Sequence, residues 1–206
     1  MQQPGDLLND ADGQVVLFRQ YMAAEDARDA YEALLASSPW RQEELSLFGR
    51  KVLTPRLSSW HGDVPYTYSG LAMTPEPWTP QLLMIRKRVE AVSGRTFNSV
   101  LLNLYRDGRD SMGWHSDDEP ELGINPTIAS VSLGETRRFR LRHKAGKEKT
   151  LSIDLPDASL LLMSGPLQHH WQHAVPKTSR KIGARINLTF RWTSPPATAA
   201  LHEISD

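Results

Sequence analysis

Residues 183–192, Gly-Ala-Arg-Ile-Asn-Leu-Thr-Phe-Arg-Trp, alternate strictly between polar and apolar side chains from Arg185 to Arg191. This period is typical of a β-strand that packs one face on a hydrophobic core. The second half of the chain therefore predicts an antiparallel β architecture, because Gly, Pro and Asp separate a series of similar short runs. The other runs lie at 98–105, 127–133, 137–143, 149–155, 159–163 and 170–175.

Two stretches ahead of these strands have helical periodicity, residues 24–36 and 80–93. The second begins with Thr79 and Pro80, a capping residue followed by a first-turn proline, and ends before Gly94. Helices that precede many evenly spaced short strands favour a closed or double-sheeted β structure. We therefore expect a mainly β (α+β) fold, a jelly roll with an N-terminal helical buttress.

The rest of the chain is less regular. Residues 45–70 are rich in aromatic residues, Gly and Pro, which predicts hairpins and an ordered loop rather than core strands. With 206 residues, one compact domain is expected, over 15–192. A flexible tail is expected over 1–14 and a loose tail over 193–206. The first fourteen residues lack the basic start and apolar core of a secretory signal.

Composition narrows the possible chemistry. The chain is 39% hydrophobic and 23% charged, as in soluble globular proteins, and it has no apolar run near the ~18 residues of a membrane span. It contains no cysteine, which excludes disulfides, zinc ribbons, iron–sulfur clusters and thiol catalysis, and any metal must bind to His and carboxylate. We expect a cytoplasmic protein, associated with the nucleoid in a bacterium or nuclear in a eukaryote.

A candidate metal site begins at Trp-His115-Ser-Asp117. On an extended backbone, His115 and Asp117 share one face with their α-carbons about 6–7 Å apart. A third ligand is needed, and a set of two His and one carboxylate leaves positions open for a co-substrate and O2. His173 leads into an apolar alternation that suits a strand end, but His169 and His170 also fit on the residues alone.

A candidate anion site lies on the polar face of residues 185–191. Arg185 and Arg191 would lie about 20 Å apart along a strand, so inclined side chains could hold a small dicarboxylate. Asn103-Leu-Tyr105 repeats the polar alternation in a second strand, which suggests a wet pocket between them. The alternative is an amphipathic surface strand with exposed arginines.

The HxD motif at 115–117, a distant His and the RxNxTxR pattern of 185–191 together resemble the AlkB family of Fe(II)- and 2-oxoglutarate-dependent nucleic-acid dealkylating dioxygenases. The similarity runs from about Val15 to Trp192 and includes NLYRDGRDSMGWHSDDEPELG and IASVSLGETRRF. It is closest to the branch of human homologues that repair DNA.

The resemblance implies a double-stranded β-helix, or jelly roll, over about 98–192, with a nucleotide-recognition lid over about 45–70. It also implies the cofactors Fe(II), 2-oxoglutarate and O2, and places Arg185 on the distal carboxylate with Arg191 nearer the iron, where it is counted as catalytic with the metal ligands. The implied iron ligands are His115, Asp117 and His173, and the implied 2-oxoglutarate residues are Asn103, Tyr105, Arg185, Asn187, Thr189 and Arg191.

The resemblance further suggests residues that contact a base extruded from the stack. Phe48 matches an apolar wedge, and its neighbours Arg50, Lys51 and Arg56 could meet phosphates. For the tyrosines of this segment the alternative is a hairpin packed on the sheet, and for the acids after Asp117 it is a solvated loop. The basic stretch 137–149 either binds the complementary strand or is a face exposed to solvent. The remaining candidates for base contact are Trp60, Tyr66, Tyr68, Ser69, Asp118 and Glu119.

The sequence thus predicts oxidative demethylation of bases such as 1-methyladenine and 3-methylcytosine in DNA, with RNA as a second candidate substrate. In the family, 2-oxoglutarate becomes succinate and CO2, and the methyl group leaves as formaldehyde. A monomer without membrane contact is expected. The alternative is a 2-oxoglutarate dioxygenase that acts on a protein or a small molecule, and the choice between single and double strands stays open.

Overall fold

Two antiparallel sheets dominate the structure, a computed structural model that describes residues 4–47, 50–63, 66–68, 71–73, 75–146 and 149–194. The larger sheet has seven strands in the order β1-β2-β13-β10-β15-β8-β5, and the smaller has four in the order β12-β11-β14-β9. The large-sheet strands are β1 (Gly5–Asp10), β2 (Gly13–Phe18), β5 (Leu57–Gly62), β8 (Ser99–Tyr105), β10 (Ile128–Gly134), β13 (Ser159–Ser164) and β15 (Arg185–Arg191). The small-sheet strands are β9 (Met112–His115), β11 (Arg137–His143), β12 (Thr150–Leu155) and β14 (Trp171–Val175).

The eight strands from β8 to β15 form the jelly roll. Four of them, β8, β10, β13 and β15, lie in the large sheet, and the other four make up the small sheet. The pairs among them are antiparallel. This arrangement of two sheets of four strands is the jelly-roll architecture, so the expected fold is confirmed.

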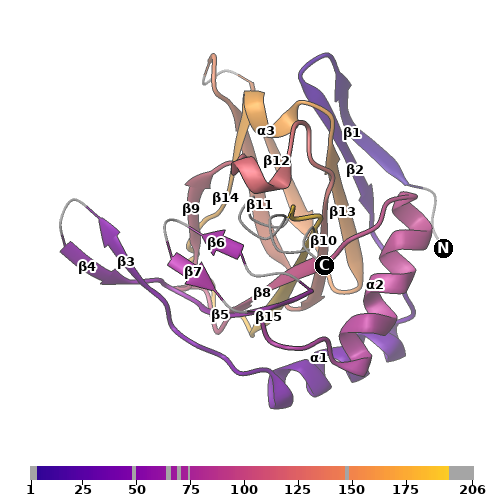
Figure 1. The fold of residues 1–206 in the computed structure, drawn as a ribbon, viewed down its shortest axis with the longest axis vertical. Coiled ribbons are helices and arrows are strands. Elements are labelled where there is room, and N and C mark those ends of the chain that lie inside the picture. The colour runs from indigo at the N-terminus through magenta and orange to yellow at the C-terminus, as the bar shows by residue number, and fades with distance from the viewer. Residues whose placement is uncertain are drawn as a thin grey trace, which may run out of the picture.

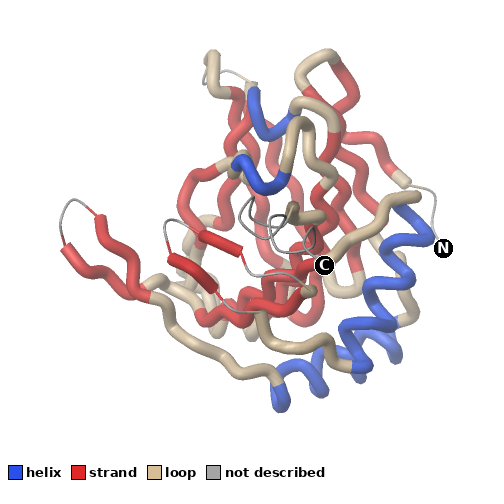
Figure 2. Tube along the Cα trace, viewed as in Figure 1, coloured by secondary structure: helices blue, strands red, loops and turns tan. Residues whose placement is uncertain are grey.

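Helices cover one face of the large sheet, and two hairpins stand apart from the sandwich (Figure 1). In Figure 2, both long helices lie on the same outer side of the sandwich, and the β3–β4 hairpin projects away from it. None of the helices in the described part of the chain is both long and apolar enough to cross a bilayer. These elements are α1 (Ala24–Ser37), α2 (Pro80–Ser93), the short α3 (Leu167–His170) and η1 (Pro120–Leu122), with hairpins β3 (Glu44–Leu47) to β4 (Arg50–Leu53) and β6 (Tyr66–Tyr68) to β7 (Leu71–Met73).

Strand β15 lies between two hydrophobic clusters, one under the helices and one between the two sheets. Its apolar residues Ile186, Leu188 and Phe190 are fully buried in the cluster that includes residues of α1 and α2. Because side chains alternate along a strand, its polar residues point to the opposite face, between the two sheets. The second cluster lies there and includes Phe139, Leu141, Met163 and Trp171. The large sheet thus buries an apolar face under the helices and a mixed face toward the small sheet.

The ends of α2 are set by its sequence as expected. The Thr79 side chain accepts a hydrogen bond from the backbone N–H of Leu82, Pro80 occupies the first turn, and Gly94 ends the helix in the left-handed region at φ 64°. A side chain with a β-carbon rarely adopts that conformation, whereas glycine does so freely. The two long helices begin and end within a residue of the predicted positions.

Three boundaries differ from the expectations. Residues 5–10, assigned to a flexible tail, form β1 and pair with β2 from Gly5–Leu17 to Asp10–Gly13, because an edge strand is held by its ladder and needs little hydrophobic pattern. Residues 57–62, assigned to hairpins and loop, form β5, a strand of the large sheet, paired with β8. Thr193, assigned to a loose tail, is fully buried and donates its backbone N–H to Asn98 Oδ1.

Strand β5 escaped the pattern because both of its faces are buried although half of its side chains are polar. Ser58, Ser59 and His61 are each less than 8% exposed. His61 satisfies its ring nitrogens locally, with Nε2 3.0 Å from Ser59 Oγ and Nδ1 2.7 Å from the Pro77 carbonyl oxygen. Buried polar groups that find such partners do not produce the alternation that identifies a strand.

The N-terminal cap of α2 provides a test of how much local signals stabilise this fold. Thr79→Ala removes the oxygen that accepts from Leu82 N–H, so the free energy of unfolding should fall by about 1 kcal/mol. Thr79→Ser keeps the acceptor and should differ little from the wild type. Urea denaturation of the three proteins measures the difference, and an equal loss for Ala and Ser would exclude the cap as its cause.

Candidate metal and oxo-acid site

Two imidazoles meet because two strands of the small sheet are paired in register. His115 ends β9 and lies directly opposite His173 on β14. Directly opposite residues of an antiparallel pair project from the same face, and here that face looks toward the large sheet. The two rings are 4.1 Å apart between centroids, and Phe139 stacks on His173 at 5.3 Å.

A carboxylate completes the group from the turn after β9. Asp117 Oδ1 lies 3.9 Å from His115 Nε2, and its Oδ2 lies 3.9 Å from His173 Nε2. His115 Nδ1–H donates a 2.9 Å hydrogen bond to the carbonyl oxygen of Gly113, which leaves the lone pair on Nε2, on the side of Asp117. Two imidazoles and one carboxylate form a donor set suited to Fe(II) that leaves coordination positions open.

The other histidine candidates lie elsewhere. His170 lies near Asp12 and His143, a second group of three possible ligands at the β1–β2 turn, and not near His115. His143 Nδ1 accepts the Ala145 N–H, so its proton lies on Nε2 facing Asp12 Oδ2, at 3.1 Å. That tautomer favours a hydrogen bond over a metal bond. The structure therefore brings His173, and not His169 or His170, to the HxD motif.

Burial and charge set the protonation of the three groups. Burial lowers the pKa of His173 to about 3, and the neighbouring His115 adds to this effect. Burial likewise lowers the pKa of His115. For Asp117, burial raises the pKa, but the neighbouring groups, chiefly the positive charge of Arg191, outweigh it, so the pKa is lowered. At neutral pH both imidazoles are neutral and the carboxylate is ionised, the forms that bind a metal ion.

Arg191 links the triad to the large sheet. Its Nη2 donates to Asp117 Oδ1 at 2.8 Å, and both side chains are at most 5% exposed. A buried ion pair of this kind is strong only because neither charge has water nearby. The last arginine of β15 therefore lies at the end of the pocket that holds the triad.

Arg185 lies at the other end of the strand and is fully buried. Its Nη2 donates to Ser132 Oγ at 2.9 Å and to Asn187 Oδ1 at 2.6 Å. Its Nε and Nη1 have no hydrogen-bond partner within the described residues. Burial lowers the pKa of Arg185 to about 10, so the guanidinium still carries its charge at neutral pH. Buried N–H groups without an acceptor are rare and costly, so the Arg185 guanidinium keeps a capacity to bind an anion.

Polar residues between the arginines are tied into one network. Asn187 Nδ2 donates to Thr189 Oγ1 at 2.7 Å, and Asn187 Oδ1 also accepts from Ser130 Oγ. The Tyr105 ring lies 5.4 Å below the Arg185 guanidinium and 5.2 Å from that of Arg137. Most of the residues expected to hold 2-oxoglutarate line one pocket, whereas Arg185 does not line it and is connected to it by its hydrogen bond to Asn187. They share a pocket with the triad, and that pocket is lined by Asn103, Tyr105, Asn187, Thr189, Arg191, His115, Asp117 and His173 among others.

Arg56 corrects one sequence expectation. It was assigned to phosphate contact beside the wedge, but it is only 6% exposed and its Nε donates to Asn103 Oδ1 at 2.8 Å. A guanidinium buried against a pocket residue cannot also reach the backbone of a nucleic acid. The physical reason is that β5 belongs to the large sheet, which draws the residue that precedes it inward.

The other substrate candidates have different environments. Trp60 is buried on β5, opposite Leu101 of the pocket. Asp118 is exposed, with its Oδ2 3.3 Å from Lys144 Nζ, and Glu119 is half-buried beside Asp117, where burial raises its pKa. Tyr66 and Tyr68 lie on β6. Phe48 and Ser69 lie outside the described residues.

The basic stretch is divided by strand alternation. Arg137 is buried and donates to the carbonyl oxygens of Asp107, Asp110 and Pro176. Arg138 is exposed and paired with Asp154 at 2.8 Å, and Arg142 lies 4.3 Å from the Trp114 ring. The described part of this stretch is therefore largely engaged within the protein.

Sequence reasoning missed three site residues. Ser130 and Ser132 alternate with Ala129 and Val131 on β10, the neighbour of β15, so the same polar alternation could have identified them. Gln168 belongs to no sequence motif, but its Oε1 accepts a hydrogen bond from the backbone N–H of Asp117 at 3.0 Å. Nothing in the local sequence points to that contact.

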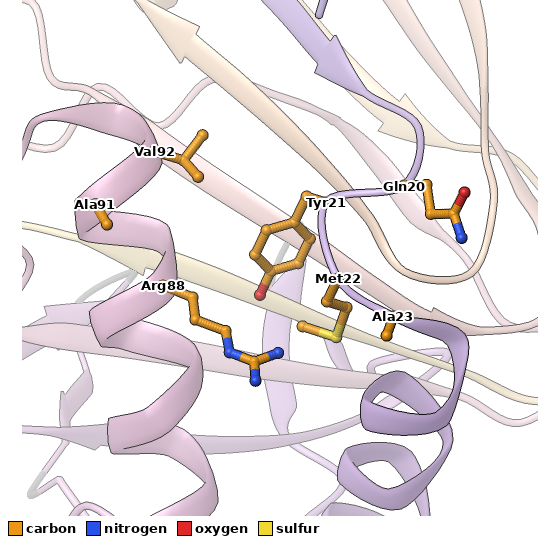
Figure 3. A pocket seen from close by; sticks show the side chains of 7 residues that line it. All are labelled: Gln20, Tyr21, Met22, Ala23, Arg88, Ala91 and Val92. Carbon is orange, nitrogen blue, oxygen red and sulfur yellow. The ribbon is translucent and has the colours of Figure 1, made fainter. Parts of the chain in front are cut away.

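Cavity size does not identify the site. The pocket at the triad is narrow, about 40 Å³, whereas a hollow of about 680 Å³ opens between α2 and residues 20–23. Figure 3 shows this hollow, with the Tyr21 hydroxyl and the Arg88 guanidinium on its walls. Arg88 is already paired with Asp26 at 2.6 Å. The hollow holds none of the possible metal-ligating groups found among the described residues, so the chemistry points to the smaller pocket.

Comparison with known proteins agrees with this geometry. The profile of the 2OG-Fe(II) oxygenase superfamily matches residues 14–191. Alpha-ketoglutarate-dependent dioxygenase alkB homolog 3 of Bos taurus is 42% identical over 195 residues, 90% of this chain and 68% of that protein. The human protein of the same name is 41% identical over the same shares of each chain.

Two further similarities are more partial. DNA oxidative demethylase ALKBH2 of Homo sapiens is 43% identical over 156 residues, 71% of this chain and 60% of that protein. The solved structure of OsALKBH1 superposes with a TM-score of 0.61 at 16% identity, covering 91% of this chain and all of the other, which supports the fold alone. The profile and the relatives together show that the chain belongs to the 2OG-Fe(II) oxygenase superfamily and, within it, to the AlkB family.

Proposed function

We propose that this protein oxidatively demethylates N-methylated bases of the 1-methyladenine and 3-methylcytosine type in DNA, with RNA as a second substrate. The observation that carries the proposal is the group of His115, Asp117 and His173 on one pocket, where the Asp117 oxygens lie 3.9 Å from both imidazoles. Further along β15, the buried Arg185 has two N–H groups without a partner among the described residues. Relatives more than 40% identical are named as dioxygenases of the alkB type or DNA oxidative demethylases.

The metal role of the triad rests on its donor set. Two neutral imidazoles and an ionised, buried carboxylate would hold Fe(II) on one face and leave the opposite face open. Fe(II) in such a site, with O2 and 2-oxoglutarate, supplies the oxidation that converts 2-oxoglutarate to succinate and CO2 and releases the methyl group as formaldehyde. The protein's part is to keep all three ligands in the form that binds.

The oxo-acid role rests on the two arginines. Arg185 would receive the distal carboxylate through Nε and Nη1, the two groups that have no partner. Arg191, already at Asp117, would neutralise the end near the metal. Asn103, Tyr105, Asn187 and Thr189 would fix the chain of the dicarboxylate between these ends, because they line the pocket between them.

The substrate role rests on what surrounds the open side. A base must leave the stack to reach a recessed metal, and it is then held by aromatic faces and polar edges. Glu119 is half-buried beside Asp117, so its carboxyl can meet an exocyclic amine, and Asp118 lies on the rim. Tyr66 and Tyr68, on the β6–β7 hairpin, would cover the base together with Ser69, and Trp60 would act from below through the packing of β5.

The wider setting follows from this proposal. We propose that the protein acts as a monomer on single- or double-stranded nucleic acid. It would do so in the cytoplasm, at the nucleoid of a bacterium or in the nucleus of a eukaryote. We also propose one functional domain over 15–192, with the lid formed by the parts of 45–70 on either side of β5, which itself belongs to the large sheet. Support comes from the profile match over 14–191.

The direct test incubates the purified protein with Fe(II), 2-oxoglutarate and methylated oligonucleotides and measures base mass. Asp117→Ala removes the carboxylate ligand, so demethylation should fall by more than roughly 100-fold. Asp29→Ala, an exposed acid on α1, is the matched control and should keep full activity. No mass loss from any oligonucleotide, with succinate still formed, would replace the nucleic-acid substrate by another while retaining the dioxygenase.

Arg185 provides a test that is independent of turnover. Arg185→Met removes a buried charge with two unsatisfied N–H groups. Without 2-oxoglutarate, the free energy of unfolding of the variant should therefore equal that of the wild type or exceed it by up to about 1–3 kcal/mol. The variant should lose the stabilisation of about 2.7 kcal/mol that 2-oxoglutarate at 100 times its Kd gives to a binding protein. Denaturant unfolding of the Mn(II)-loaded protein with and without 2-oxoglutarate measures both.

Arg138→Met, at an exposed pair with Asp154, is the control and should retain the response to 2-oxoglutarate. Equal stabilisation of the Arg185→Met variant and the wild type by 2-oxoglutarate would contradict the assignment of Arg185.

The wedge assignment is tested at Phe48. Phe48→Ala removes the apolar group expected to fill the space that an extruded base leaves, so duplex demethylation should fall on the order of 10-fold while single-strand activity changes little. Leu35→Ala, an exposed apolar residue on α1, controls for general loss of surface hydrophobicity. Parallel assays on matched single- and double-stranded oligonucleotides measure the ratio, and equal losses on both would remove the wedge.

A further inference from the structure

The backbone of Asp117 lies where no strand can hold it. Strand β9 ends at His115, and its pairing with β14 is already irregular between His173 and Val175. Yet Asp117 is only 2% exposed, so its backbone N–H needs a partner within the protein. That partner is the side chain of Gln168, whose Oε1 accepts at 3.0 Å.

Gln168 reaches the Asp117 backbone from α3, the short helix that precedes β14. It lies in α3, is 1% exposed, and is followed after two residues by β14, which carries His173. Two more contacts join the same segments. Ser116 Oγ donates to the Trp171 carbonyl oxygen at 2.9 Å, and Lys144 Nζ bridges the Gln168 carbonyl oxygen and Asp118 Oδ2.

The Gln168 amide differs from these neighbours in what it holds. It is the contact that reaches the backbone of the candidate ligand itself, whereas the others hold the residues before and after it. From the opposite side, Arg191 draws the Asp117 carboxylate toward β15 with a 2.8 Å hydrogen bond. Without a fixed backbone, that attraction would turn the carboxylate away from the two imidazoles.

A second observation separates a functional amide from a packing residue. Gln168 Nε2 is buried and has no hydrogen-bond partner among the described residues. A buried unsatisfied donor destabilises a protein, so packing alone does not explain an amide at this position. The amide is explained by the one bond it makes, to Asp117.

We propose that Gln168 is a positioning residue that fixes the Asp117 backbone and thereby aims its carboxylate at the point shared with His115 and His173. This inference rests on the proposed metal role of the triad. Gln168 touches neither the metal position nor the substrate, and it acts through Asp117 alone. Side chains that orient a metal ligand in this way are worth roughly 10- to 100-fold in metal affinity.

The test compares side chains that differ only in the acceptor. Gln168→Met keeps the length and removes the oxygen, Gln168→Asn keeps the amide but shortens its reach, and Gln168→Glu keeps an oxygen at the same reach. Gln172→Met is the matched control, because Gln172 is the second residue of β14 and, among the described residues, its side chain accepts hydrogen bonds from Arg142 alone. Each full-length protein is titrated anaerobically with Co(II), and affinity and visible absorption are recorded.

We expect Gln168→Met and Gln168→Asn to weaken Co(II) binding by roughly 10- to 100-fold and to alter its absorption. Gln168→Glu should lie closer to the wild type than to the Met variant, and Gln172→Met should match the wild type. Metal-free Gln168→Met loses an unsatisfied donor but leaves the buried Asp117 N–H without its acceptor, so we expect its unfolding temperature to change little or to fall by a few degrees while the protein still folds. If Met fails to fold, the comparison of Asn with Glu decides the outcome in the same way.

Wild-type affinity and absorption in a folded Met or Asn variant would overturn the role of Gln168. Failure of the underlying proposal looks different, because Asp117→Ala would then leave Co(II) affinity unchanged. A protein in which Asp117→Ala abolishes binding and Gln168→Met does not would retain the metal site and refute only the positioning role.

Discussion

Two guanidinium groups lie between the sheets of this protein, and the residues around them compensate for the burial of their charges. Arg185 is fully buried and Arg191 nearly so. Burying a charge costs several kcal/mol unless other groups compensate for the lost water. Asp117 compensates Arg191 directly, whereas Ser132 and Asn187 satisfy only part of Arg185. The N–H groups of Arg185 that these side chains do not satisfy leave its guanidinium able to bind an anion.

The apolar face of the large sheet offsets the cost of burying these charges on its other face. Ile186, Leu188 and Phe190 pack beneath α1 and α2 in a cluster without charges, so β15 is anchored by apolar packing whether or not the pocket is filled. The small sheet supplies the imidazoles by register, and the turn after β9 supplies the carboxylate. Ligands that come from ladders are fixed by the fold, while the ligand beyond the strand depends on side chains from other segments.

Sequence reasoning succeeded where one local pattern determines one outcome. The alternation of Arg185 to Arg191 predicted both the strand and the division of its faces, and Thr79, Pro80 and Gly94 predicted the ends of α2. It failed for β5, whose buried serines and His61 hide the strand period, and for β1, which depends on its ladder.

Contacts between distant segments were equally out of reach. The burial of Arg56 against Asn103 spans 47 residues of chain, and the contact of Gln168 with Asp117 spans 51. Neither has a local signature, because both arise only when the two sheets and their connections are assembled. The choice of His173 over its neighbours was decided by family resemblance, and the register with His115 supplies the physical reason afterwards.

The β3–β4 and β6–β7 hairpins each form a two-stranded sheet of their own, separate from the two sheets of the sandwich. Substitutions there need not disturb the ladders that align the histidines or the packing under β15. What these hairpins contact can therefore change by substitution while the paired strands that carry the two histidines and Arg191 keep their alignment.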